Sequence, residues 1–104
     1  MKTVLVPIAP GFEEIETITV VDILRRSGAR VTLAGTEQGP LKGSRGILVL
    51  PDDSLNNIME IDFDWIVLHG GQPGTDSLLK DARVTQLLKK MDGLSKNIAA
   101  ICAA

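Results

Sequence analysis

The chain has 104 residues, with 11 Lys and Arg against 13 Asp and Glu, so its formal net charge is −2. A content of 44% hydrophobic and 23% charged residues is typical of a globular domain and excludes a disordered chain. Without a basic excess, and with only two Phe and one Trp, we expect no nucleic-acid binding. The single cysteine, the lack of a signal-like N-terminus and the lack of a long apolar run indicate a cytoplasmic protein without a membrane segment.

The N-terminal third predicts a strand, a helix and a second strand. Thr3–Ile8 is apolar without alternation, which indicates a strand buried on both faces, as in a parallel sheet. Residues 13–27 read as a helix because acidic residues come first, arginines come last and Gly28 follows. Residues 30–34 form the next predicted strand.

The rest of the chain continues this alternation. Glycines at 39, 43 and 46 indicate a hairpin or an edge excursion over residues 36–51, and Ser54 can cap a short helical turn to residue 59. Trp65–Leu68 is a third buried strand. A helical apolar period at residues 84–91 precedes Gly93, predicted as the helix end, and residues 97–101 form a last strand that leads into Cys102.

This order predicts an α/β fold with a parallel sheet and helices packed on it. The last strand is not followed by a helix that could cover it. We therefore expect residues 1–104 to be a single α/β domain that is an N-terminal fragment, or one chain of a cleaved protein. The first helix has apolar residues nearly all round, which indicates burial on more than one side. The sheet covers one side. A subunit interface or missing parts of the chain are the alternatives for the other.

In such sheets, ligands bind beyond the carboxyl ends of the strands. Cys102 stands where a strand would turn into a helix, the position of an exposed nucleophile, or else it is a small buried hydrophobe. Glu16 falls between Val20 and Ile23 on a helical wheel, where it is an acid among apolar groups, or it only complements the helix dipole. Gly70 and Gly71 could supply oxyanion amides or form an ordinary turn.

The single histidine, His69, is either a base for Cys102 or a hydrogen-bonded structural residue. One His and one Cys cannot complete a zinc shell, so we expect no metal site.

Four segments together resemble the ThiJ/PfpI superfamily, in the branch of the parkinsonism-associated deglycase and bacterial YajL. They are residues 9–17, 43–46, 68–71 and 99–104. The resemblance implies a flavodoxin-like α/β sandwich, a homodimer through the first helix and no cofactor. It also implies that Cys102 is the oxidisable nucleophile, that Glu16 is a protonated acid bonded to it, that Gly71 and Ala103 give oxyanion amides, and that Arg45 lies at the rim.

The resemblance implies that the protein is a cysteine-dependent glyoxalase or deglycase-like hydrolase. Its substrate would be a small carbonyl compound such as methylglyoxal, and its role would be stress-protective. The alternative is a non-enzymatic redox sensor or chaperone that uses Cys102. Two departures stand out. Proline is usual at the position of His69, and family chains are roughly twice as long, so the usual catalytic histidine would belong to a complementary C-terminal segment.

Overall fold

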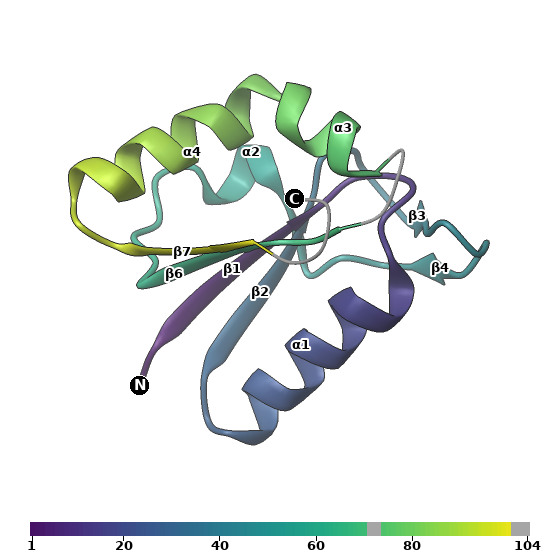
Figure 1. The fold of residues 1–104 in the computed structure, drawn as a ribbon, viewed down its shortest axis with the longest axis horizontal. Coiled ribbons are helices and arrows are strands. Elements are labelled where there is room, and N and C mark those ends of the chain that lie inside the picture. The colour runs from purple at the N-terminus through teal and green to yellow at the C-terminus, as the bar shows by residue number, and fades with distance from the viewer. Residues whose placement is uncertain (71–73, 101–104) are drawn as a thin grey trace.

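The computed structural model describes residues 1–70 and 74–100, and its centre is a five-stranded sheet in which every pairing is parallel. The strand order is β5-β2-β1-β6-β7 (Figure 1). The sheet strands are β1 (Thr3–Ile8), β2 (Arg30–Gly35), β5 (Asp53–Ser54), β6 (Trp65–Leu68) and β7 (Asn97–Ala100), and the helices are α1 (Glu14–Arg26), α2 (Leu55–Ile58), α3 (Gly74–Lys80) and α4 (Ala82–Gly93). A separate antiparallel hairpin joins β3 (Leu41–Lys42) to β4 (Leu48–Val49).

Strand β1 occupies the middle of the sheet. It pairs with β2 along its whole length, from Thr3 opposite Arg30 to Ile8 opposite Gly35, and with β6 on its other side. Strands β6 and β7 end together, with Leu68 opposite Ala100. Parallel pairing in this register brings the segments that follow β1, β6 and β7 to one rim of the sheet.

The two faces of the sheet carry different helices: α1 covers one, and α2, α3 and α4 cover the other (Figure 1). Alternation along β1 divides the core accordingly, because Val4 and Val6 join a cluster with α1 while Leu5 joins the cluster under α4. A strand with both faces buried reads as a continuous apolar run, which explains the sequence of β1.

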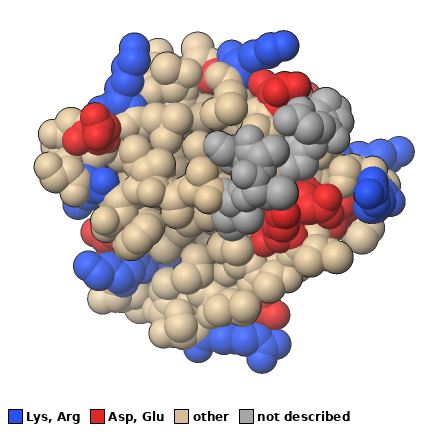
Figure 2. Space-filling model, viewed as in Figure 1, with Lys and Arg blue, Asp and Glu red and all other residues tan. Residues whose placement is uncertain are grey.

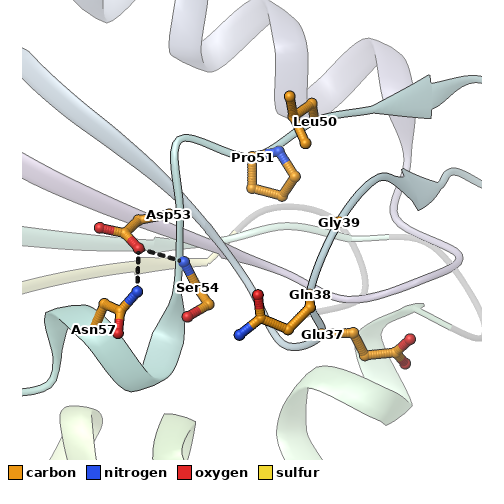
Figure 3. Close-up of a pocket in the computed structure, with 8 residues that line it drawn as sticks. All are labelled: Glu37, Gln38, Gly39, Leu50, Pro51, Asp53, Ser54 and Asn57. Carbon is orange, nitrogen blue, oxygen red and sulfur yellow. Dashed lines mark hydrogen bonds between the residues drawn. The ribbon is translucent and has the colours of Figure 1, made fainter.

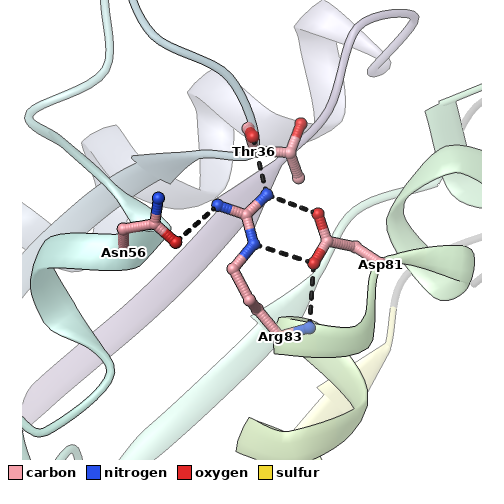
Figure 4. A network of polar contacts seen from close by, with 4 residues as sticks. All are labelled: Thr36, Asn56, Asp81 and Arg83. Carbon is pink, nitrogen blue, oxygen red and sulfur yellow. Dashed lines mark hydrogen bonds and ion pairs between the residues drawn. The ribbon is translucent and has the colours of Figure 1, made fainter.

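A polar network fixes the start of α4. The Asp81 side chain accepts the Arg83 backbone N–H, which caps the helix, and pairs with the Arg83 guanidinium at 2.6 Å. The same guanidinium donates to Asn56 of α2 and to the carbonyl of Thr36 after β2 (Figure 4). One arginine therefore holds three segments that lie far apart in the sequence.

Beside α1, the sheet is open toward β6 and β7. An apolar groove of about 470 Å³ runs here, and no described helix covers it. Its lining residues are Lys2, Val4, Val20, Leu24, Ser27, Ala29, Trp65, Val67 and Ala99. On the face in Figure 2 the Lys and Arg side chains are spread around the outline, and uncharged residues fill much of the area between them.

The predicted α/β fold and its four long strands are confirmed, and so is Gly28, whose φ of 98° suits the residue after a helix. Three details of the prediction were wrong or incomplete. Helix α3 and strand β5 were not predicted, since neither is long enough to show a period. Helix α4 ends at Gly93, as predicted, but the residue with a positive φ beyond it is Ser95. Ser54 precedes α2 without a capping hydrogen bond from its side chain.

The open groove leads to a prediction for the polypeptide of residues 1–104 expressed alone. An uncovered apolar sheet face favours association, so we expect broad thermal unfolding and a mass that rises with concentration. Calorimetry and sedimentation velocity over a concentration series measure both. A sharp cooperative transition from a stable monomer would contradict this expectation.

Candidate active site

The loop after β1 and the loop after β6 are in direct contact at the rim of the sheet. The backbone N–H of Glu13, the residue before α1, donates to the carbonyl of Gly70 at 3.3 Å. Gly74 opens α3 so close to Gly11 that an added Cβ would lie 2.5 Å from the Gly11 carbonyl carbon. Only glycine permits this approach, which brings the starts of α1 and α3 together.

Glu16 stands in the first turn of α1, at the rim. Its side chain is half-buried, and its Oε1 atom is buried without a hydrogen-bond partner among the described residues. An unpaired buried carboxyl oxygen is unfavourable in a folded protein unless some group meets it. The atom is therefore available to a substrate or to a residue outside the described part of the chain.

His69 follows β6 and is almost completely buried, with 1% of its surface exposed. Its Nδ1 atom lies 2.7 Å from the Gly70 carbonyl oxygen, and its Nε2 atom accepts the Ala9 backbone N–H at 3.4 Å. Burial lowers the pKa of His69, while the Gly70 carbonyl and the negative charge of Glu16 act in the opposite direction with smaller effect. Glu16 and His69 thus belong to one electrostatic neighbourhood.

Glu14 has a structural role that the sequence analysis did not recognise. It is 5% exposed, and its Oε2 atom accepts the backbone N–H groups of Arg45 and Ile47, while Oε1 accepts the Ser44 hydroxyl. Burial raises the pKa of Glu14, but these bonds and that of its own backbone N–H lower it more, so its pKa lies below the ordinary value. Glu14 therefore fixes the turn between β3 and β4.

A signal for this role was present in the sequence. Glu14, Thr17 and Val21 have helical spacing, and all three are buried on α1. The turn of residues 43–46 also leaves backbone N–H groups that need an acceptor.

The predicted site residues fall into three groups. Glu16 and Gly70 lie at the same rim, in the neighbourhood of His69. Arg45 is exposed and meets the carboxylate of Glu14 through its backbone N–H. Cys102, Gly71 and Ala103 lie outside the described residues, so their predicted roles stay predictions.

No metal cluster marks the described part of this rim, and a polar cavity at the same edge of the sheet lies apart from the predicted site residues. Within residues 1–70 and 74–100 there is no group of three or more His, Asp or Glu side chains that could hold a metal ion. A polar cavity of about 200 Å³ lies at the carboxyl ends of β2 and β5, where Asp53 accepts from Asn57 and from the Ser54 backbone (Figure 3). Its lining residues, none of them a predicted site residue, are Glu37, Gln38, Gly39, Leu50, Pro51, Asp53, Ser54 and Asn57.

Comparison with known proteins agrees with this arrangement. Residues 2–104 match the DJ-1/PfpI family. The chain belongs to this family. DJ-1/PfpI is the ThiJ/PfpI superfamily to which the sequence motifs pointed, so that resemblance is confirmed.

Individual DJ-1/PfpI proteins match almost the whole chain. Protein dj-1beta of Drosophila melanogaster is 43% identical over 99% of this chain and 56% of its own length. Glutathione-independent glyoxalase DJR-1.2 of Caenorhabditis elegans is 36% identical over 98% and 55%. The structure of oxidized Toxoplasma gondii DJ-1 superposes with a TM-score of 0.97 at 38% identity, covering 99% of this chain and 56% of that one. The chain thus spans about half the length of these relatives.

The contact between Gly43 and Glu14 gives a stability prediction. A Cβ at Gly43 would overlap the Glu14 carboxyl group, so Gly43→Ala should lower the free energy of unfolding by about 1–3 kcal/mol. Gly93→Ala is the matched control, because nothing lies within 4 Å of its added Cβ and alanine favours a helix. Denaturant unfolding of the full-length protein measures both variants. Equal effects of the two substitutions would show that the Glu14 contact does not hold the turn.

Proposed function

We propose that this protein is a cysteine-dependent glyoxalase or deglycase-type hydrolase that acts on methylglyoxal-like dicarbonyls or their adducts and so protects against carbonyl stress. The observation that carries the proposal is the buried Oε1 atom of Glu16, unpaired among the described residues, at the rim where family resemblance puts Cys102. A relative is named a glutathione-independent glyoxalase. A thiol of the enzyme can take the place of glutathione as the nucleophile, and Cys102 is the only cysteine in this chain.

The reaction begins with addition of the Cys102 thiolate to the substrate. The thiolate sulfur bonds to the aldehyde carbon, the carbonyl π electrons move to oxygen, and that oxygen takes a proton from Glu16, which gives a hemithioacetal. The amides of Gly71 and Ala103 are assigned to the developing oxyanion. Transfer of hydrogen from C1 to C2 then gives a thioester. Water hydrolyses the thioester, which frees the thiolate and the hydroxy acid, and the acid proton returns to Glu16. The reaction consumes one water and needs no external oxidant or reductant.

The alternative is a redox sensor or chaperone in which oxidation of Cys102 is the signal. The T. gondii relative whose structure is so similar was solved as an oxidized protein. Thiols that oxidise readily share a low pKa and solvent access with nucleophilic ones, so the two functions depend on the same residue. Measuring whether the protein turns over methylglyoxal distinguishes the enzyme from the sensor or chaperone.

Two binding partners belong to this proposal. The groove beside α1 would take a complementary C-terminal segment, which would bring the histidine of the family site. Helix α1 would form a homodimer, because Ile15, Ile18 and Ile23 are 76%, 41% and 58% exposed. Exposed Ile47 lies near the start of α1, since its backbone N–H donates to the Glu14 carboxylate.

We assign the protein to the cytoplasm, where a thiol stays reduced. The described residues contain no helix long and apolar enough to cross a membrane.

The catalytic assignment predicts an order among variants of the full-length protein. Cys102→Ser should abolish methylglyoxal turnover. Glu16→Ala should lower kcat about 100-fold or more and raise the Cys102 pKa, whereas Glu16→Gln, which keeps a hydrogen-bond donor, should raise that pKa less. Lactate formation and the pH dependence of alkylation by iodoacetamide measure these effects. Glu13→Gln, at the residue directly before the same helix, serves as the control and should behave like wild type.

Activity that survives Cys102→Ser would exclude the covalent mechanism. A wild-type protein without turnover but with a reversibly oxidised Cys102 would support the sensor instead.

The dimer assignment has a separate test. Ile18→Lys places a charge in the exposed apolar face of α1 and should shift the full-length protein from dimer to monomer. Ile61→Lys is the matched control, because Ile61 is 48% exposed but follows α2, away from α1. Sedimentation equilibrium gives the mass of each. A dimer that survives Ile18→Lys would place the interface elsewhere.

A further inference from the structure

His69 is the buried titratable residue that the proposed mechanism does not use. It stands directly after β6, and three segments meet around its ring and backbone. The Phe12 ring from the β1–α1 loop packs edge-on against the imidazole, with the two ring centroids 6.2 Å apart. The Thr75 hydroxyl of α3 donates to the His69 carbonyl at 3.4 Å. His69 and Thr75 are each 1% exposed, so these contacts are shielded from water.

Hydrogen bonding fixes the protonation of the ring. The Gly70 carbonyl can only accept, so Nδ1 must carry a hydrogen, and the Ala9 N–H can only donate, so Nε2 must carry the lone pair. One neutral tautomer satisfies both bonds. A second proton on Nε2 would direct an N–H at the Ala9 N–H and break that bond.

The Gly70 carbonyl accepts two hydrogen bonds, from Nδ1 of His69 and from the N–H of Glu13 at the start of α1. His69 is thus connected to Gly70 and, through Ala9, to the segment that leads to Glu16. We propose that His69 is a positioning residue for the proposed reaction, whose Nδ1-protonated ring holds the ends of β1 and β6 so that Glu16 and Gly70 keep their relative places. This inference rests on the proposed function.

Burial sets the direction of the pH response of the ring. The titratable group that acts on the ring among the described residues is Glu16 on α1, which exerts no negative charge in the protonated form that the proposed reaction requires, while Phe12 and Thr75 are uncharged. Since burial lowers the pKa of His69, the unfolded chain binds a proton at higher pH than the folded one. The stabilisation by the neutral ring is therefore complete above the ordinary histidine pKa of about 6.5 and is lost as the pH falls toward the folded value.

The test compares two variants of the full-length protein. His69→Gln keeps an acceptor that can reach the Ala9 N–H, whereas His69→Leu keeps bulk but removes both ring bonds. We expect kcat/KM to fall about tenfold or more in the leucine variant and to recover to within about threefold of wild type with glutamine. Val84→Ala, in the core under α4, is the control for lost stability without a contact to His69, and its activity should stay near wild type.

Two further readouts do not depend on turnover. Nitrogen NMR, with the His69 signal assigned from the glutamine variant, should show Nδ1 protonated and a titration midpoint below that of free histidine. The rate of Cys102 alkylation should change in the leucine variant and not in Val84→Ala. If wild type lacks turnover, the proposed function fails, and these two readouts still test the position of His69. An Nε2-protonated ring, or a leucine variant that behaves like Val84→Ala, would overturn the inference.

Discussion

The contact between the loops after β1 and β6 is the constraint on which the candidate site depends. Parallel pairing brings the ends of the two strands to one rim, but it leaves the loops free in direction. Gly74 against Gly11 and the Glu13–Gly70 hydrogen bond remove that freedom. With the loops fixed, α1 and α3 begin close together at the rim and then run over opposite faces of the sheet. Glu16 lies in the first turn of α1, beside this contact.

The long elements of this fold could be predicted from the sequence, and the short ones could not. A nearly unbroken apolar run defines β1 and β6, and acidic residues at the start, arginines at the end and a following glycine define α1. By contrast, β5 has two residues and depends on its pairing with β2, a contact between distant parts of the chain. The end of α4 shows the same limit, because the helix stops at Gly93 as the sequence indicated, but the left-handed backbone conformation falls on Ser95.

The sequence predicts which residue types form the candidate site, but it does not predict that Glu14 and Glu16 have different roles. A helical wheel separates Glu14 from Glu16, yet it does not say which surface each will meet. The structure gives Glu14 three partners in the β3–β4 turn and leaves Oε1 of Glu16 without one among the described residues. Two glutamates of one helical turn thus serve different purposes, one holding a turn and the other remaining available for chemistry. His69 could be located but not interpreted, because its tautomer depends on the carbonyl and the amide that meet it.

The central position of β1 has a consequence for biosynthesis. This strand is made before its partner β6, which comes about 60 residues later, and at roughly 5–20 residues per second the interval lasts several seconds. During that time one edge of an apolar strand lacks its native neighbour and is open to pairing with other nascent chains. The order of strands in the sheet therefore leaves an apolar edge of the growing polypeptide unpaired for longer than pairing between neighbouring strands of the sequence would.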